Sequence, residues 1–331
     1  MPRRLLISLA LALAVLPAGT AHAVLGSWNL REQHRVRVAG LMHYLSDNRF
    51  HGERPLRGRQ LPAALKGLAA RLALPAVGAP ARPVSVIGFD RLLVRQLGAV
   101  DVAAAVQAQA RDAGLRPPAY FGTEVVARFL GLRDNHADER LELYPWQSIT
   151  RAEAAHSFAV ALKLGAGGAA WARETFARFL LPRYSAAQRR VLALAVAKIG
   201  MPYIWGGETD GTSSYFGGQV HGGYDCSGFA WRVFKISGFS WGRQITGRTA
   251  AMQAGEIPRG ARIRLADVHP ADLLFFGPGR FWQRATEQRI VHEGIALSRD
   301  WMIHASAQGV YVSPLFDPWR AHEFSWARRV L

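Results

Sequence analysis

A change of pattern at residues 164–170 limits the possible folds of this chain more than any other feature. The segment there, "LGAGGAA", consists of small, flexible residues of the kind that separate folded units. Upstream the chain reads mostly as helices, whereas downstream, after one more helical stretch, it reads as strands and glycine-rich loops. We therefore predict a mostly helical domain over 24–164 and an α+β domain over 185–331, joined by a linker and helix over 165–184.

The first 23 residues are set apart from both units. Arg3 and Arg4 precede the apolar run "LLISLALALAVLP", and the small residues of "AHA" end at Ala23. This pattern is typical of a secretory signal that is removed, here after Ala23. The run is shorter than the roughly 20 residues that span a bilayer, which argues against a membrane anchor. We expect a secreted or cell-envelope protein with no integral membrane segment once the signal is cleaved.

The chain is strongly basic, with a net charge of +17. Such a charge attracts polyanions. Because the sequence carries no nucleic-acid-binding signature, anionic cell-wall polymers or acidic lipid surfaces are the partners that we favour for an exported protein, and no nucleic acid is expected. A generally arginine-rich composition without a specific partner is the alternative. The histidines lack the short, regular spacing of a zinc set, so we expect no metal and no other cofactor.

The helical half contains a weak internal repeat. Three stretches share a branched apolar residue followed by an amphipathic helix, and these apolar residues are Leu56, Val84 and Ile149. In the third stretch, "SITRAEAAHSFAVAL", Thr150 and Glu153 have the spacing of a capping box, in which each side chain accepts a backbone N–H at the helix start. A preceding helix, "FGTEVVARFLGL", completes a helix–loop–helix pattern.

This helix–loop–helix pattern ending in "ITRAE" resembles the S-layer homology (SLH) repeat, and residues 119–164 carry the match. The resemblance implies binding of anionic secondary wall polymers, with Thr150, Arg151 and Glu153 as the wall-polymer-binding residues. In the two earlier stretches the arginine position holds glycine or valine, and the helix starts are irregularly spaced. The alternative reading is that "TRAE" only caps a helix in a scaffold.

The chain contains one cysteine, Cys226, which excludes an intramolecular disulfide framework. It follows a glycine-rich loop, and Phe229, Val233 and Ile236 behind it recur at helical spacing. We therefore predict a helix that begins near Cys226 and ends at Gly238. The macrodipole and the free backbone amides at a helix start favour a thiolate over a thiol, so we predict that this cysteine is reactive.

Two histidines follow on predicted strands. Residues 289–306, "RIVHEGIALSRDWMIHAS", read as two strands joined by a three-residue turn, after an earlier buried strand at "ADLLFFGP". In the register where Gly294 faces His304, the side chains of His292 and His304 become diagonal neighbours on one face. Glu293 points to the other face and is expected to be peripheral.

A thiol at a helix start and two imidazoles on one strand face suit nucleophilic acyl transfer. In this reading Cys226 attacks, His292 accepts and returns the proton, and His304 orients His292. A lone histidine on a strand is usually structural, so the combination of the three residues carries the prediction of catalysis.

Residues 185–315 contain five motifs in this order: "PYIWGG", "YDCSGF", "PADLLFF", "HEGIAL" and "MIHAS". In these motifs, residues 185–315 resemble the NlpC/p60 cell-wall cysteine peptidases. The resemblance implies a reduced papain-like α+β domain in which the cysteine helix packs on an antiparallel sheet. It implies hydrolysis of peptidoglycan stem peptides, as a D,L-endopeptidase that cuts after D-γ-glutamate. It also implies that Tyr203 lies near the oxyanion and the substrate, and that Asp225 and Ser227 hold the substrate's amino end.

Two other functions stay open. A catalytically silent wall-binding module need not keep a cysteine and two histidines. An amidase or acyltransferase on the same fold has less use for Asp225 and Ser227, which suit a free amino terminus.

Overall fold

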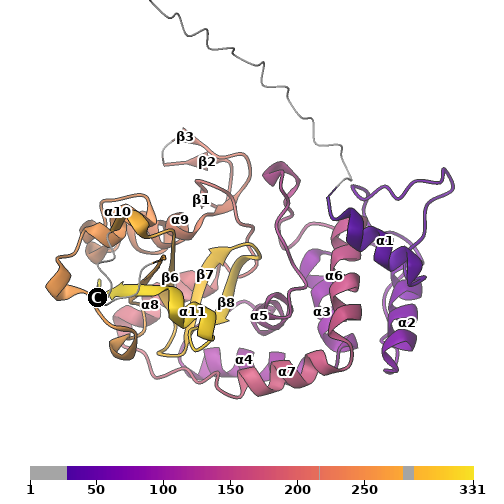
Figure 1. Cartoon of the computed structure of the whole chain (residues 1–331), viewed down its shortest axis with the longest axis horizontal. Helices are drawn as coiled ribbons and strands as arrows, with labels where there is room; N and C mark the ends of the chain where they lie inside the picture. The colour runs from indigo at the N-terminus through magenta and orange to yellow at the C-terminus, as the bar shows by residue number, and fades with distance from the viewer. Residues whose placement is uncertain (1–27, 216, 279–286) are drawn as a thin grey trace, which may run out of the picture.

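The computed structural model describes residues 28–215, 217–278 and 287–331. The predicted signal at 1–23 lies outside these residues. In Figure 1 the helical half, coloured indigo to magenta, lies beside an orange and yellow half that contains the sheet. Within the described part of the chain, no helix has the length and apolar character needed to cross a membrane.

The N-terminal half is built from helices packed around a common core. The helices are α1 (Leu30–Val38), α2 (Gln60–Leu72), α3 (Val86–Gln96), α4 (Val100–Asp112), α5 (Phe121–Phe129), α6 (Arg151–Leu164) and α7 (Gly167–Phe176), with a 3-10 turn at Glu139–Leu141. The apolar faces that predicted helices are the faces that become buried. Phe89 of α3 and Phe158 of α6, for example, meet edge to face with ring centroids 5.3 Å apart.

The three stretches of the internal repeat meet in space. The backbone N–H of Leu56 donates to the carbonyl oxygen of Ile149 over 3.0 Å, and the N–H of Ile149 donates to the carbonyl oxygen of Val84 over 2.9 Å. All three side chains are buried. The residues that share a position in the repeat are therefore hydrogen-bonded neighbours at the centre of this half.

The second half begins with α8 (Ala186–Val196), which starts at a complete capping box formed by Ser185 and Gln188. The predicted helix at the cysteine is α9 (Cys226–Ala230), and it continues as a π-helical segment (Trp231–Ile236). Gly238, with a φ of +74°, follows that segment, as the sequence predicted. The shorter helices are α10 (Ala250–Gly255) and α11 (Pro318–Glu323), with 3-10 turns at Ser240–Gln244, Arg259–Ala261, Leu265–Asp267 and Glu287–Arg289.

An antiparallel sheet with the strand order β8-β7-β6-β5-β9 forms the centre of this half. Its strands are β5 (Leu273–Phe276), β6 (His292–Ala296), β7 (Trp301–Ser306), β8 (Gly309–Pro314) and β9 (Phe324–Arg328). Ile295 pairs with Ile303 and Ala296 with Met302, which is the predicted register. Before Cys226, two small hairpins pair β1 (Glu208–Thr209) with β4 (Gly223–Tyr224) and β2 (Ser213–Ser214) with β3 (Gly217–Gly218).

The sheet is covered on both faces. Phe275, Ile295 and Trp326 belong to the large core on which α9 packs, whereas Leu274 and Met302 belong to a separate apolar cluster on the other face. A strand covered on both sides has no polar face, which explains why "LLFF" is a continuous apolar run.

The predicted linker at 165–184 packs against both halves. It contains α7, which contacts α4 and α6. At the end of α7 the ring of Phe176 stacks on Trp301 of β7, with centroids 4.9 Å apart and planes 16° from parallel. This aromatic contact ties the connecting segment to the sheet.

Candidate active site

Cys226 is the first residue of α9. The Asp225 carboxylate accepts the backbone N–H of Gly228 and so caps this helix. The Cys226 side chain is half-buried and unpaired with any other cysteine. A backbone hydrogen bond from Glu293, the neighbour of His292 in β6, acts on its thiol, and α9 packs directly on β6. The nucleophile predicted from the sequence therefore lies against the strand that carries the predicted base.

The prediction that the helix start makes Cys226 a thiolate is wrong for the unliganded protein. Burial raises the pKa of the Cys226 thiol to about 12, and the carboxyl groups of Glu293 and Asp225 act in the same direction. Backbone amides at Glu293 and Ser227 lower the pKa, but less. Loss of hydration outweighs the helix start here, since a short helix offers only a partial charge.

The two histidines meet on one face of the sheet, as predicted. His292 Nε2 lies 2.8 Å from His304 Nδ1, and His304 is fully buried. Gly294 permits this approach, because a Cβ there would lie 3.1 Å from the His304 Cβ and 3.0 Å from the Met302 sulfur. The contact uses one nitrogen of each ring and leaves Nδ1 of His292 for another partner. The catalytic roles of both residues stay predictions.

Both imidazoles are neutral at neutral pH. Burial lowers the pKa of His292 to about 3, and the charge of Arg320 acts in the same direction. Burial, His292 and Arg320 hold the pKa of His304 well below its ordinary value. With the thiol also protonated, Cys226, His292 and His304 are all neutral before the reaction. Hydrogen bonds then decide which ring nitrogen of each histidine carries the proton.

Glu293 is not peripheral, contrary to the expectation from the sequence. Its side chain is fully buried, and neither carboxyl oxygen has a hydrogen-bond partner among the described residues. Strand alternation does turn Glu293 away from His292, but that face is the one on which α9 packs. Burial and the charge of Asp225 raise the pKa of Glu293 well above its ordinary value, which favours the protonated carboxyl.

The Asp225 carboxylate is surrounded by donors from the protein itself. Arg248 Nη1 donates to Asp225 Oδ1 over 3.0 Å, and Ser227 Oγ donates to the same oxygen over 3.2 Å. The N–H of Gly206 donates to Oδ2 over 3.0 Å, and Arg248 also bonds Glu208 over 2.9 Å. Arg248 is a site residue that the sequence analysis missed, because nothing in its local sequence reveals a partner 23 residues away. The roles of Asp225 and Ser227 toward a substrate amine remain predictions.

Tyr203 lines a groove between the two halves. The groove encloses about 590 Å³, and its walls are the loop 135–140 on one side and Tyr203, Trp205 and Val220 on the other. The N–H of Trp205 donates to Glu139 Oε1 over 2.7 Å, which joins the two walls. Burial raises the pKa of Tyr203, and Cys226 is the next largest cause, so the phenol lies within electrostatic reach of the thiol.

The three wall-polymer candidates make their contacts inside the protein. The Thr150 hydroxyl accepts the N–H of Glu153 over 3.2 Å and caps α6 as predicted. The Glu153 carboxylate does not reach back to complete the box and instead pairs with Arg133 over 2.8 Å. Arg151 is buried and donates to the carbonyl oxygen of Phe50 over 2.7 Å. These contacts account for all three residues structurally, and their wall binding stays a prediction.

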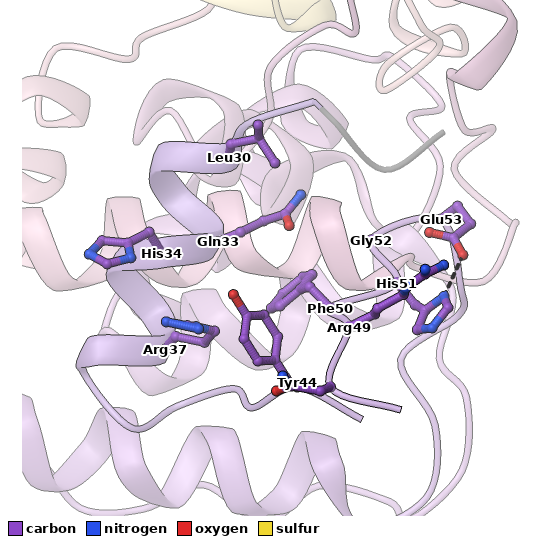
Figure 2. A pocket seen from close by; sticks show the side chains of 11 residues that line it. Leu30, Gln33, His34, Arg37, Tyr44, Arg49, Phe50, His51, Gly52 and Glu53 are labelled. Atoms are coloured by element: carbon purple, nitrogen blue, oxygen red, sulfur yellow. Dashed lines mark hydrogen bonds and ion pairs between the residues drawn. The ribbon is translucent and has the colours of Figure 1, made fainter. Parts of the chain in front are cut away.

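A second hollow of about 560 Å³ lies in the helical half, between α1 and the segment 44–53. Figure 2 shows Arg37 beside the ring of Tyr44, and its guanidinium carbon lies 4.0 Å from the ring centroid. His51 bonds Glu53 over 3.0 Å at the other end. Among the residues that the structure describes, neither Arg37 nor Arg49 pairs with a carboxylate. The hollow therefore has a cationic lining.

A cysteine at the start of a helix, packed on an antiparallel sheet that carries two hydrogen-bonded histidines, is an arrangement suited to a thiol hydrolase. The model of the NlpC/P60 family matches residues 200–329. A "Probable endopeptidase" of Haemophilus influenzae is 32% identical over 124 residues, which are 37% of this chain and 69% of that protein. The chain belongs to the NlpC/P60 family.

Other relatives match a comparable share of this chain. The "Gamma-D-glutamyl-L-lysine dipeptidyl-peptidase" of Bacillus subtilis is 30% identical over 111 residues, which are 34% of this chain and 29% of that protein. This chain thus spans less than a third of that relative. The solved NlpC/p60 domain of peptidoglycan hydrolase SagA is 26% identical, with a TM-score of 0.30, and the match covers 43% of this chain and 97% of that one. The helical half precedes the family match, so its likeness to SLH repeats stays a prediction.

Proposed function

We propose that this protein is a cysteine-type endopeptidase of the cell envelope that hydrolyses peptidoglycan stem peptides. The observation that carries the proposal is the 2.8 Å contact between His292 and His304. His292 belongs to β6, the strand against which Cys226 lies. The names of the relatives support the substrate class. A silent wall-binding module would have no need of this buried histidine pair, which counts against that alternative.

The reaction begins from neutral groups. The Cys226 sulfur bonds to the carbonyl carbon of the scissile amide while its proton passes to His292 Nδ1. Coupling the two events avoids a free thiolate, which the raised thiol pKa and the lowered His292 pKa disfavour. The oxyanion accepts hydrogen bonds from the Cys226 backbone N–H and the Tyr203 hydroxyl.

The second half of the reaction returns every group to its starting state. The imidazolium of His292 gives its proton to the leaving amine, and a thioester remains. His292 then takes a proton from water, whose oxygen attacks the thioester carbon. The C–S bond breaks, the sulfur regains its proton from His292, and the product leaves as a carboxylic acid that gives its own proton to the solvent.

The bond that we propose is the one after D-γ-glutamate, a D,L-cleavage. The name of the Bacillus subtilis relative supports this bond, whereas an Escherichia coli relative, 28% identical, is named "Murein DD-endopeptidase MepS/Murein LD-carboxypeptidase". Mass spectrometry of the products from a defined muropeptide tests the proposal. We expect fragments ending in D-γ-glutamate from the wild type and no cleavage by Cys226→Ala. Equal activity of the variant would rule out the cysteine mechanism.

We also propose that the protein is exported and that its helical half binds anionic wall polymers. The support is the net charge of +17, the signal-like N-terminus and the cationic hollow at Arg37 and Arg49. Co-sedimentation with purified cell walls tests this binding. We expect Arg37→Glu combined with Arg49→Glu to reduce the pelleted fraction severalfold, and the exposed Arg116→Glu, paired with Arg111→Glu to match the charge change, to leave it near wild type. Equal pelleting of both pairs would contradict a role for the hollow.

A further inference from the structure

Ser313 of β8 lies behind the two imidazoles. Met302 pairs with Ser313 and His304 pairs with Tyr311, so Ser313 shares the sheet face of His304. Ser313 Oγ lies 3.0 Å from His304 Nε2, and both side chains are buried. Among the described residues this is the one hydrogen bond of the Ser313 hydroxyl. A continuous line of contacts therefore runs from His292 through His304 and ends at Ser313.

The hydroxyl stands among apolar neighbours. Met302, opposite Ser313, and Leu315, further along the chain, belong to the apolar cluster on this face of the sheet. A buried hydroxyl in such surroundings is unfavourable unless it forms a hydrogen bond, and the bond available is the one to His304. A polar side chain at position 313 is therefore useful only if His304 needs a hydrogen-bond partner there.

The hydrogen bonds between His292, His304 and Ser313 can be arranged in two ways, because one proton lies in each of the two contacts. For neutral His292 to accept a proton at Nδ1, its own proton has to be on Nε2. That N–H donates to His304 Nδ1, which is then bare, and neutral His304 carries its proton on Nε2. The Nε2–H of His304 in turn donates to Ser313 Oγ.

The reverse arrangement blocks the reaction. If the Ser313 hydroxyl donates to His304 Nε2, the proton of His304 is on Nδ1 and donates to His292 Nε2. Neutral His292 then carries its proton on Nδ1 and has no lone pair to offer Cys226. The direction of the bond at Ser313 thus decides whether His292 is a base.

We propose that Ser313 is a positioning residue which, by accepting the Nε2–H of His304, selects the tautomers in which His292 Nδ1 can take the Cys226 proton. This inference rests on the proposed function, in which His292 is that base. Burial keeps His304 neutral, so it is the tautomer, and not the charge, that has to be controlled.

Steady-state kinetics on a defined muropeptide test the role. Ser313→Ala removes the acceptor, and we expect kcat to fall at least about tenfold, toward the ~10⁴-fold loss known for a histidine held in the wrong tautomer, with KM within about twofold of wild type. Ser313→Thr keeps the hydroxyl and is expected to restore kcat. Ser325→Ala, which removes a buried hydroxyl from β9 of the same sheet, is the control for a loss of packing. An unchanged kcat in Ser313→Ala would overturn the proposal.

Nitrogen-15 NMR of the histidine rings gives a readout that needs no substrate. In the wild type we expect His292 and His304 both to be protonated at Nε2, and in Ser313→Ala we expect His304 to shift to the Nδ1–H form. A wild-type His304 protonated at Nδ1 would overturn the proposal even if the protein cleaves peptidoglycan. Conversely, a wild type without peptidase activity would refute the proposed function while the ring tautomers still decide the role of Ser313.

Discussion

At the scale of single residues, the Glu293 side chain makes the stability of the fold sensitive to pH. It places a carboxyl group with two unpartnered oxygens in the core beside the nucleophile. The charged groups that act on it come from every side: Asp225 before α9, Arg248, Glu256 after α10, and Arg328 of β9. Burial and the two acids outweigh the two arginines, so the pKa of the carboxyl is raised and its protonated form is favoured.

This protonation makes the stability of the protein depend on pH. An unfolded Glu293 has an ordinary pKa near 4.5, whereas the folded pKa lies well above it. Between those values the folded state binds more protons than the unfolded state, so the free energy of unfolding falls as pH rises, by up to about 1.4 kcal/mol per pH unit. Glu293→Gln, which is neutral at every pH, should lose this slope and become the more stable protein above neutral pH.

Urea unfolding of the wild type and Glu293→Gln at several values between pH 5 and pH 8 measures the difference. We expect a gap in the free energy of unfolding that widens with pH and exceeds about 1 kcal/mol at pH 8. The exposed Glu174→Gln is the matched control and should follow the wild-type curve. Parallel curves for wild type and Glu293→Gln would mean that the buried carboxyl is already ionised or already solvated.

At the scale of elements, the sequence predicted most of what local patterns encode. The hairpin of β6 and β7 formed in the expected register because the turn length and the alternation of apolar residues fix it together. That register alone was enough to bring His292 to His304. The helix at Cys226 and its end at Gly238 also follow from spacing and from a glycine able to adopt a positive φ.

What the sequence could not predict depends on how elements pack. The thiol pKa follows from how deeply α9 is buried against β6, which no local pattern contains. Glu293 was expected to be peripheral because strand alternation says which face a residue takes but not what covers that face. Arg248 reaches Asp225 and Glu208 from a distant loop, and the groove at Tyr203 exists only because the loop 135–140 packs beside it.

At the scale of the whole molecule, one arginine joins the two halves. Arg128 of α5 donates to the carbonyl oxygen of Gly200 over 2.9 Å and also to that of Gln308, in the turn between β7 and β8. Two glycines make room for the Arg128 guanidinium beside these carbonyl groups. A Cβ on Gly200 would lie 3.4 Å from the guanidinium, and a Cβ on Gly309, the residue after Gln308, would lie 3.0 Å from it. The same side chain pairs with Glu124 over 3.1 Å inside the helical half.

Replacing Arg128 should lower the free energy of unfolding and let the two halves unfold separately. In Arg128→Met the fully buried Glu124 loses the guanidinium that it is hydrogen-bonded to and keeps only the more general effect of the Arg133 charge, and burial already raises the pKa of Glu124 to about 7. Breaking a buried ion pair on one side costs about 3–5 kcal/mol. We expect a loss of that size in the free energy of unfolding, measured by urea denaturation. We also expect one transition for the wild type and two for the variant, because the contacts at Gly200 and Gln308 disappear.

A double-mutant cycle separates the two effects of Arg128. Replacing Glu124 as well, in Arg128→Met with Glu124→Leu, removes the stranded carboxyl and should recover most of the lost free energy, because a buried pair can be replaced by apolar groups at little cost. The splitting of the transition should persist in this double variant, since the backbone carbonyls of the second half remain without their donor. If the double variant unfolds in one transition, the halves are held together by the Phe176 stack on Trp301 and the groove contacts instead of by Arg128.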